Sequence, residues 1–156
     1  GIQVHNQSVQ EAEAGTRTAI NFQGLEKTAI QRGEVLSSPG ALKSSYMVDV
    51  LLHFLKSNAK PIKNRALVRF HTGTSEILGN LILLDREELA PGDTTVAQLR
   101  LNSPVALIRE DRFVIRSYSP VRTIGGGQVL NPIPQKHKRF KDNIVEGLKS
   151  LSHQAP

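Results

Sequence analysis

The sequence predicts an all-β fold: one antiparallel β-barrel, preceded by an incomplete second barrel and followed by one short helix. Three observations predict it. From Tyr46 to Asn131, short apolar segments rich in β-branched residues alternate with turn residues, at a spacing of roughly 10 to 15 residues. The first 36 residues hold only a few such segments, and a single apolar stripe with helical spacing follows Pro134.

The first 36 residues contain three candidate strand regions. Ile2–Val9 and Arg17–Phe22 alternate polar and apolar residues, and a turn at Ala14-Gly15 separates them. Ile30–Leu36 is predicted to be a further short strand with Gly33 at its centre. So few short strands cannot close a hydrophobic core. Residues 1–36 are therefore expected to be the C-terminal part of a barrel.

Residues 37–45 are polar and contain a Pro-Gly pair, which predicts a linker between domains. Residues 46–132 have the pattern of a complete domain. Seven or eight strands of this length and spacing favour a closed antiparallel barrel or a sandwich. The predicted strands are Met47–Leu55, Leu67–Phe70, Glu76–Leu84, Thr94–Leu101, Val105–Ile108, Phe113–Ile115 and Thr123–Leu130.

The tail, residues 133–156, is predicted to be a linker and a helix. Pro132 and Pro134 end the β region, and Lys136–Leu151 is expected to be helical. Its apolar stripe is formed by Phe140, Ile144, Val145, Leu148 and Leu151. A single helix with such a stripe needs a surface to pack on, and it is expected to begin a further domain.

The charge of the chain favours a polyanionic partner. The 156 residues carry a net charge of +6 and contain no cysteine, which excludes disulfides, thiolate metal sites and a cysteine nucleophile. Residues 1–44 have four basic and four acidic side chains, residues 45–132 have eleven and eight, and residues 133–156 have five and two. Polyanion binding is therefore expected in the middle and the tail. An ordinary solvated basic surface is the alternative.

The sequence shows no catalytic constellation and no phosphate-binding loop of the Walker type. The five histidines are scattered, without metal-ligand spacing. His53 lies in an apolar segment and is expected to be a core histidine rather than a metal ligand. The acidic pairs Glu87-Glu88 and Glu110-Asp111 flank turns, as solvated loop charges do. We therefore expect no enzymatic activity, no metal and no cofactor in this chain, and no membrane-spanning segment.

The glycine triplet Gly125–Gly127, which follows Arg122, is the most informative motif. Three consecutive glycines among β-branched residues predict a strand broken by a tight bend, where the backbone passes close to a bulky group. One interpretation is a barrel corner. The other is close approach of backbone amides to a phosphate chain, assisted by Arg122.

A series of motifs resembles the third domain of translational GTPases related to elongation factor Tu. They occur in the family's order: Phe70–Thr74, Gly79–Asp85, Pro91–Asp93, Asn102–Val105, Asp111–Arg116 and Arg122–Gly127. Ala14–Asn21 and Ile30–Leu36 are similar to the last strands of the family's second domain. Gln3–Gln7, the run from His71 to Asp85, and a chain that continues beyond the barrel resemble the bacterial selenocysteine-specific branch.

The resemblance implies a middle piece of a larger factor, and Gly1 in place of Met fits this expectation. The piece would comprise part of domain II, all of domain III and the start of a C-terminal winged-helix extension. The parent is then expected to be a cytoplasmic GTPase that uses GTP and Mg²⁺. Its expected partners are selenocysteinyl-tRNA, the ribosome and, through the missing C-terminal domains, a hairpin in the selenoprotein mRNA.

The resemblance also implies roles for individual residues. Arg32, followed by Gly33, occupies the position that binds the selenocysteinyl end of the tRNA, where a guanidinium can select an ionised selenol. The barrel is expected to hold the tRNA backbone, because A-form RNA is recognised through phosphates and 2′-hydroxyl groups. The candidate backbone contacts are Lys60, Lys63, Arg65, Ser103, Arg116, Ser119, Arg122, Gly125 and Gly126.

Two alternatives stay open from the sequence. The chain could belong to another translational GTPase, such as a γ-type initiation factor, although Arg32 and the C-terminal helix argue against it. It could also be a protein-interaction barrel whose basic charge is incidental. Steep salt dependence of RNA binding would separate a tRNA-binding barrel from a protein-binding one.

Overall fold

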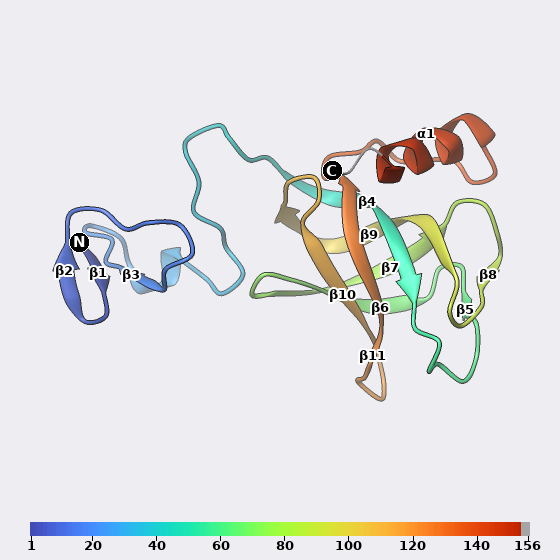
Figure 1. Ribbon diagram of the computed structural model, residues 1–156, viewed down its shortest axis with the longest axis horizontal. Coiled ribbons are helices and arrows are strands. Elements are labelled where there is room, and N and C mark those ends of the chain that lie inside the picture. Colours follow the sequence, from blue (N-terminus) through green and yellow to red (C-terminus); the bar gives the residue numbers. More distant parts are fainter. Residues whose placement is uncertain (154–156) are drawn as a thin grey trace. The chain divides into compact units, whose positions relative to one another are not determined.

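The computed structural model describes residues 1–153, which form two compact units, Gly1–Gln31 and a second that begins at Arg32. The first unit is a three-stranded antiparallel sheet in the order β2-β1-β3, with β1 at Ile2–Val4, β2 at Gln7–Val9 and β3 at Thr18–Ile20 (Figure 1). His5 and Asn6 join β1 to β2 with φ angles of 49° and 63°. Two successive positive φ angles are the signature of a type I′ hairpin turn. A 3₁₀ turn, Lys27–Ala29, follows.

The second unit is a closed barrel of six antiparallel strands in the order β10-β11-β4-β9-β7-β6 (Figure 1). The barrel prediction is confirmed. The strands are β4 Ser44–Phe54, β6 Leu67–Thr72, β7 Ser75–Leu83, β9 Thr94–Ala106, β10 Arg112–Ser117 and β11 Thr123–Asn131. A separate two-stranded sheet pairs β5, Ile62–Lys63, with β8, Glu88–Leu89.

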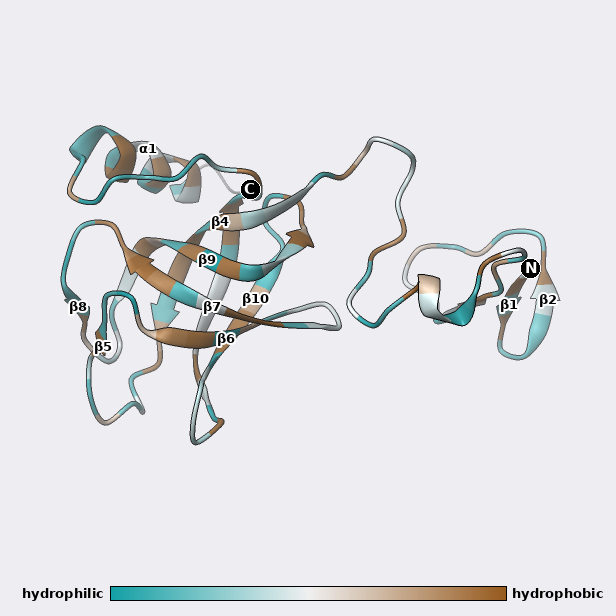
Figure 2. Cartoon of the chain, turned by 180° about the vertical axis from the view of Figure 1, so that it is seen from behind, coloured by the Kyte–Doolittle hydropathy of each residue, from teal (hydrophilic) through white to brown (hydrophobic). Residues whose placement is uncertain are grey.

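Alternation along the strands builds the core. On β4, Val48, Val50 and Leu52 are fully buried in the cluster that fills the barrel, and the rings of Phe70 and Phe113 stack across it with centroids 5.4 Å apart. Figure 2 shows brown, hydrophobic segments alternating with white and teal ones along the barrel strands. Closure leaves every strand of the barrel with two hydrogen-bonded neighbours.

Two details of the barrel differ from the predictions. Thr94–Leu101 and Val105–Ile108 are not separate strands, because β9 runs without interruption from Thr94 to Ala106 and takes up Pro104 near its end. An irregularity of register between Ser45 and Met47 on the paired strand β4 accommodates this segment.

The glycine triplet also differs, because β11 continues through it as a strand, and the irregularity of register with β10 lies just before it, at Ile124. A β-carbon on Gly127 would lie 1.9 Å from the carbonyl oxygen of Leu51, and one on Gly125 would lie 2.7 Å from that of His53. A β-carbon on Gly126 would lie 2.7 Å from the carbonyl oxygen of Phe113. The predicted close approach is therefore real, but the close neighbours are the backbones of β4 and β10.

The predicted strand at Ile30–Leu36 is wrong. This segment has no strand partner among the described residues and turns at Gly33, whose φ is +102°. A strand cannot continue through that angle, which glycine adopts more readily than other residues. Ile30, Val35 and Leu36 supply apolar residues there but no regular alternation, and the backbone conformation at Gly33 ends any strand.

The tail lies on the outside of the barrel. Helix α1 spans Asp142–His153, so the helix begins six residues later than predicted (Figure 1). Residues 132–141 form an extended strap instead, and Phe140, at φ 58°, is exposed rather than part of the stripe. The other four stripe residues pack on a second apolar cluster on the outer face of the barrel, made by Leu51, Ile82, Leu84, Val96 and Leu130. No helix among residues 1–153 is long and apolar enough to cross a membrane.

Candidate nucleic-acid interface

Three of the predicted RNA contacts meet at one end of the barrel. Lys60, Ser119 and Arg122 line a common hollow of about 510 Å³, which we call the end pocket. Lys60 comes from the loop between β4 and β5, and the other two come from the turn between β10 and β11. Residues separated by some 60 positions in the sequence are thus brought together by barrel closure.

Two polar side chains fix the loops that carry these residues. The buried Asn58 amide donates to the carbonyl oxygens of Leu55 and Ile124, at 2.8 Å in each case, and so ties the Lys60 loop to β11. The Ser117 hydroxyl donates to the Pro120 carbonyl and accepts from the Arg122 amide at 3.2 Å. Both loops are therefore held by hydrogen bonds to defined partners, which orients their side chains at low entropic cost.

The end pocket has a positive rim. Of the residues that line it, Lys60 and Arg122 are charged and none is acidic. Neither Lys60 nor Arg122 forms an ion pair among residues 1–153. Exposed cations without an internal counter-ion keep their full charge available to a phosphate.

Two other predicted contacts, Lys63 and Arg65, lie elsewhere. Lys63 is exposed on β5, opposite Glu88 of β8. Arg65 is exposed at φ 70°, and its backbone is held by an amide hydrogen bond to Leu81 at 2.7 Å. Neither Lys63 nor Arg65 lines the end pocket. Arg65 instead lies near Arg100, whose pKa is lowered by burial and then by the Arg65 charge.

Arg116 lies on β10, where it pairs in register with Thr123 and with Arg69, and it does not line the end pocket. Its Nε is buried and has no hydrogen-bond partner among the described residues. Arg69 donates to Glu76 at 2.8 Å and lowers the pKa of that carboxyl chiefly through this hydrogen bond, and the charge of Arg116 lowers the same pKa further. Arg116 therefore keeps unused hydrogen-bonding capacity.

The remaining predicted backbone contacts are dispersed. Ser103 is exposed on β9 and does not line the end pocket. Gly125 and Gly126 lie within β11 and are enclosed by β4 and β10. Their amides are engaged in the barrel sheet, so the structure brings together three of the nine candidates and leaves six outside the shared hollow.

Arg32 and Gly33 occupy the start of the second unit. Arg32 is exposed, while the Gly33 carbonyl accepts a hydrogen bond from the Ser75 hydroxyl at 2.9 Å. Gly33 also lines a hollow of about 570 Å³ whose other walls come from the β6–β7 turn and the β9–β10 connection. A β-carbon on Gly33 would lie 2.7 Å from the Ser75 oxygen, so this site requires glycine for space as well as for φ.

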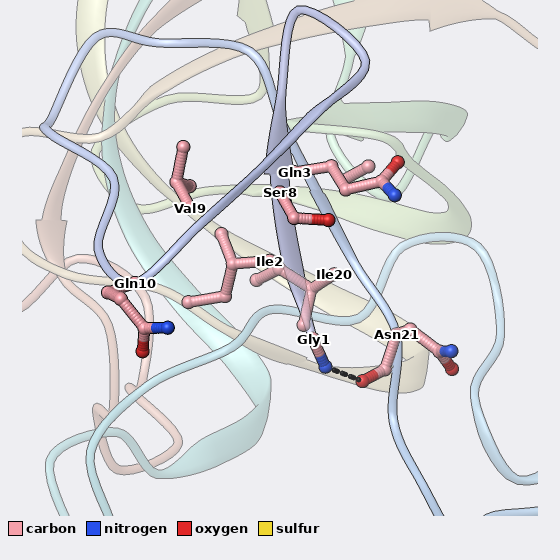
Figure 3. A pocket seen from close by; sticks show the side chains of 9 residues that line it. Gly1, Ile2, Gln3, Ser8, Val9, Gln10, Ile20 and Asn21 are labelled. Carbon is pink, nitrogen blue, oxygen red and sulfur yellow. Dashed lines mark hydrogen bonds between the residues drawn. The ribbon is translucent and has the colours of Figure 1, made fainter.

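A hollow of about 710 Å³ lies on the three-stranded sheet of the first unit and involves none of the predicted contacts. Figure 3 shows its lining, with Ile2, Val9 and Ile20 side by side and the terminal amine of Gly1 donating to the Asn21 carbonyl at 2.9 Å. On this face of the sheet Ile20 is exposed, while Ile2 and Val9 are half-buried.

The sequence analysis missed a polar cluster beneath the strap. Asp49 is fully buried, and its carboxylate accepts from Gln98 at 3.0 Å and contacts the His137 Nε2 at 2.6 Å. Arg100 donates to the His137 carbonyl at 3.0 Å, and Arg139 donates to the Leu83 carbonyl at 2.7 Å. The one available signal was a pair of polar residues, Asp49 and Gln98, at outward positions of apolar strands.

His53 was also misjudged, because it is exposed rather than in the core. Its Nδ1 lies 2.9 Å from the Thr94 hydroxyl on the neighbouring strand. His53 alternates with the buried Leu52 and Phe54, so it faces outwards. Within residues 1–153, no group of three or more histidine or acidic side chains could hold a metal ion.

Comparison with known proteins identifies the family. Residues 49–136 match the family described as "Selenocysteine-specific elongation factor, beta-barrel domain". The chain belongs to this family. The match begins within β4 and includes every candidate contact of the barrel and the first residues of the strap.

A relative supports the assignment to selenocysteine-specific elongation factors. The chain is 44% identical over 144 residues to the selenocysteine-specific elongation factor of Desulfomicrobium baculatum. The aligned part is 92% of this chain and 23% of the relative, so the chain spans about a quarter of that protein. This family membership confirms the resemblance noted in the sequence.

Proposed function

We propose that this chain is the tRNA-binding part of a selenocysteine-specific elongation factor and that the end pocket holds the backbone of selenocysteinyl-tRNA. The observation that carries the proposal is the convergence of Lys60, Ser119 and Arg122 on one hollow that no acidic residue lines. Phosphate oxygens accept hydrogen bonds from both cations, and a serine hydroxyl can bond a phosphate or a 2′-hydroxyl. Arg116 does not line this pocket and stays a candidate contact on the strength of the resemblance.

The outlying cations belong to the same proposal as peripheral contacts. Lys63 and Arg65 are exposed and would neutralise phosphates further along the backbone. Ser103, Gly125 and Gly126 stay candidates on the strength of the resemblance alone. For the aminoacyl end we propose Arg32, positioned by the fixed turn at Gly33, as the group that pairs with the selenocysteine side chain.

For the whole factor we propose the family's activity. It would bind GTP and Mg²⁺ in a nucleotide-binding domain, hydrolyse GTP, and deliver selenocysteinyl-tRNA to the ribosome in the cytoplasm. Domains beyond the barrel would bind the selenoprotein mRNA hairpin. Residues 1–153 would contribute tRNA binding and no catalytic group.

The test is the salt dependence of tRNA binding to the chain and to a Lys60→Ala/Arg122→Ala variant. Each lost phosphate contact lowers the slope of log affinity against log salt by nearly one, so the variant's slope should fall by roughly two. A Lys27→Ala/Lys43→Ala variant removes two exposed charges from residues 1–44 and serves as the matched control. Equal slopes for the two variants would contradict the proposal.

A further inference from the structure

The end pocket has a second property that phosphate binding does not explain. Its floor is apolar, made by core residues such as Phe54, Val68 and Ile124. Its walls include Leu67 and Tyr118, whose exposed fractions are 40% and 48%. A site that bound only phosphates would need donors and charge but no apolar wall.

The volume of the end pocket also suits an organic ligand larger than a phosphate. Its volume of about 510 Å³ lies within the roughly 300 to 1,000 Å³ of sites that bind small organic molecules. The Tyr118 ring is held in place, since the Arg69 guanidinium lies over it at 5.1 Å and the Arg69 Nε donates to the Tyr118 carbonyl at 3.3 Å. A fixed aromatic side chain at the edge of a cationic hollow is suited to stacking against a nucleobase.

We propose that the end pocket accepts one unstacked nucleotide of the RNA partner. Its base would lie against Leu67 and Tyr118, and its flanking phosphates would bind Lys60 and Arg122. Because bases inside an A-form helix present no free face, the nucleotide must come from a bulge, a loop or an unpaired end. This inference rests on the proposed function and adds that the chain distinguishes an unpaired nucleotide from a continuous helix.

Charge decides in favour of a nucleotide as the occupant. The rim offers two cations and no carboxylate, which complements a phosphodiester on both sides of a base. An apolar protein segment would leave both cations without a counter-ion. A nucleotide satisfies the rim and the walls together.

The test uses two RNA hairpins with the same stem, one of which carries a single unpaired nucleotide. Their affinities for the chain are measured by fluorescence anisotropy. Stacking of one base contributes on the order of tenfold to affinity, so the hairpin with the unpaired nucleotide should bind about tenfold more tightly. Tyr118→Ala should abolish this preference without changing affinity for the continuous hairpin, whereas Tyr118→Phe should retain it.

The outcomes separate this inference from the proposed function. Equal affinity of the chain for the two hairpins, with a steep salt dependence for both, would overturn the inference. Backbone binding would still stand in that case. If neither hairpin binds, both proposals fail. Thermal unfolding of the Tyr118 variants controls for folding, and Leu67→Ser supplies a second wall variant if Tyr118→Ala is unstable.

Discussion

Replacement of His137 by alanine should loosen the strap while the barrel remains folded. His137 supplies one of the two side-chain contacts of the fully buried Asp49 carboxylate, at 2.6 Å, and Gln98 supplies the other, at 3.0 Å. An unsatisfied buried neutral group costs about 1–3 kcal/mol, and removal of one member of a buried ion pair costs about 3–5 kcal/mol. Once the strap loosens, water can hydrate part of the Asp49 carboxylate, so the loss should fall at the lower end of the second range. We therefore expect His137→Ala to lower the free energy of unfolding by about 3 kcal/mol.

The variant Asp49→Asn, which removes the Asp49 charge, provides the control. Burial raises the pKa of Asp49, and the hydrogen bond and charge of His137 oppose this rise only in part. With a raised folded-state pKa, the contribution of Asp49 to stability is present below the ordinary aspartate pKa and is lost as pH rises through the folded value. Asp49→Asn removes this dependence, so the wild type should lose stability relative to Asp49→Asn as pH rises from 4 towards 7.

Urea unfolding of the two single variants and the double variant at pH 7 measures the coupling. Without the Asp49 charge, loss of His137 leaves only a neutral amide unsatisfied, so His137→Ala should cost at least 1 kcal/mol less in the Asp49→Asn background. In His137→Ala, the amides of α1 should exchange faster with solvent than they do in the wild type, while the amides of β4 should exchange at nearly the wild-type rate. Two results would contradict this role of the strap. One is a double variant whose loss of unfolding free energy equals the sum of the two single losses. The other is equal exchange of the α1 amides in the wild type and His137→Ala.

Two further predictions test other parts of the structure. Gly127→Ala would place a β-carbon 1.9 Å from the Leu51 carbonyl oxygen, so β11 must move away from β4 and the variant should lose more than about 3 kcal/mol in chemical unfolding, if it folds at all. In the full-length factor, Arg32→Ala should weaken the binding of selenocysteinyl-tRNA by roughly ten- to a hundredfold, as expected for loss of one charge-assisted hydrogen bond, and should leave the binding of seryl-tRNA nearly unchanged. An equal loss of affinity for both aminoacyl forms would place Arg32 at the common end of the tRNA.

The barrel could be predicted because its strands carry two independent signals. The alternation of buried and outward residues on β4, and the turn residues around Pro91-Gly92-Asp93, both follow local rules that do not depend on distant contacts. The same rules predicted a strand at Ile30–Leu36 that does not form. There the β-branched residues Ile30 and Val35 favoured a strand, but Gly33 takes a φ of +102° and its carbonyl accepts a hydrogen bond from the Ser75 hydroxyl.

The strap and the end pocket depend on contacts that sequence alone does not contain. Asp49 and His137 are 88 positions apart, and their pairing follows from the path of the chain after β11. The helical stripe predicted α1, but the start of the helix was misplaced, since residues 136–141 are held as a strap by the barrel surface. The family resemblance singled out Lys60 and Arg122, whereas only barrel closure shows that they share a hollow while Lys63 and Arg65 do not.

The most direct test of the account is an NMR titration of the isotopically labelled chain with an RNA helix that corresponds to the acceptor arm of the selenocysteine tRNA. We expect the largest chemical-shift changes on the amides of Lys60, Ser119 and Arg122, and we expect these changes to weaken steeply as salt is raised. Changes confined to residues away from the end pocket, or no change at low salt, would contradict the claim that this end of the barrel binds tRNA.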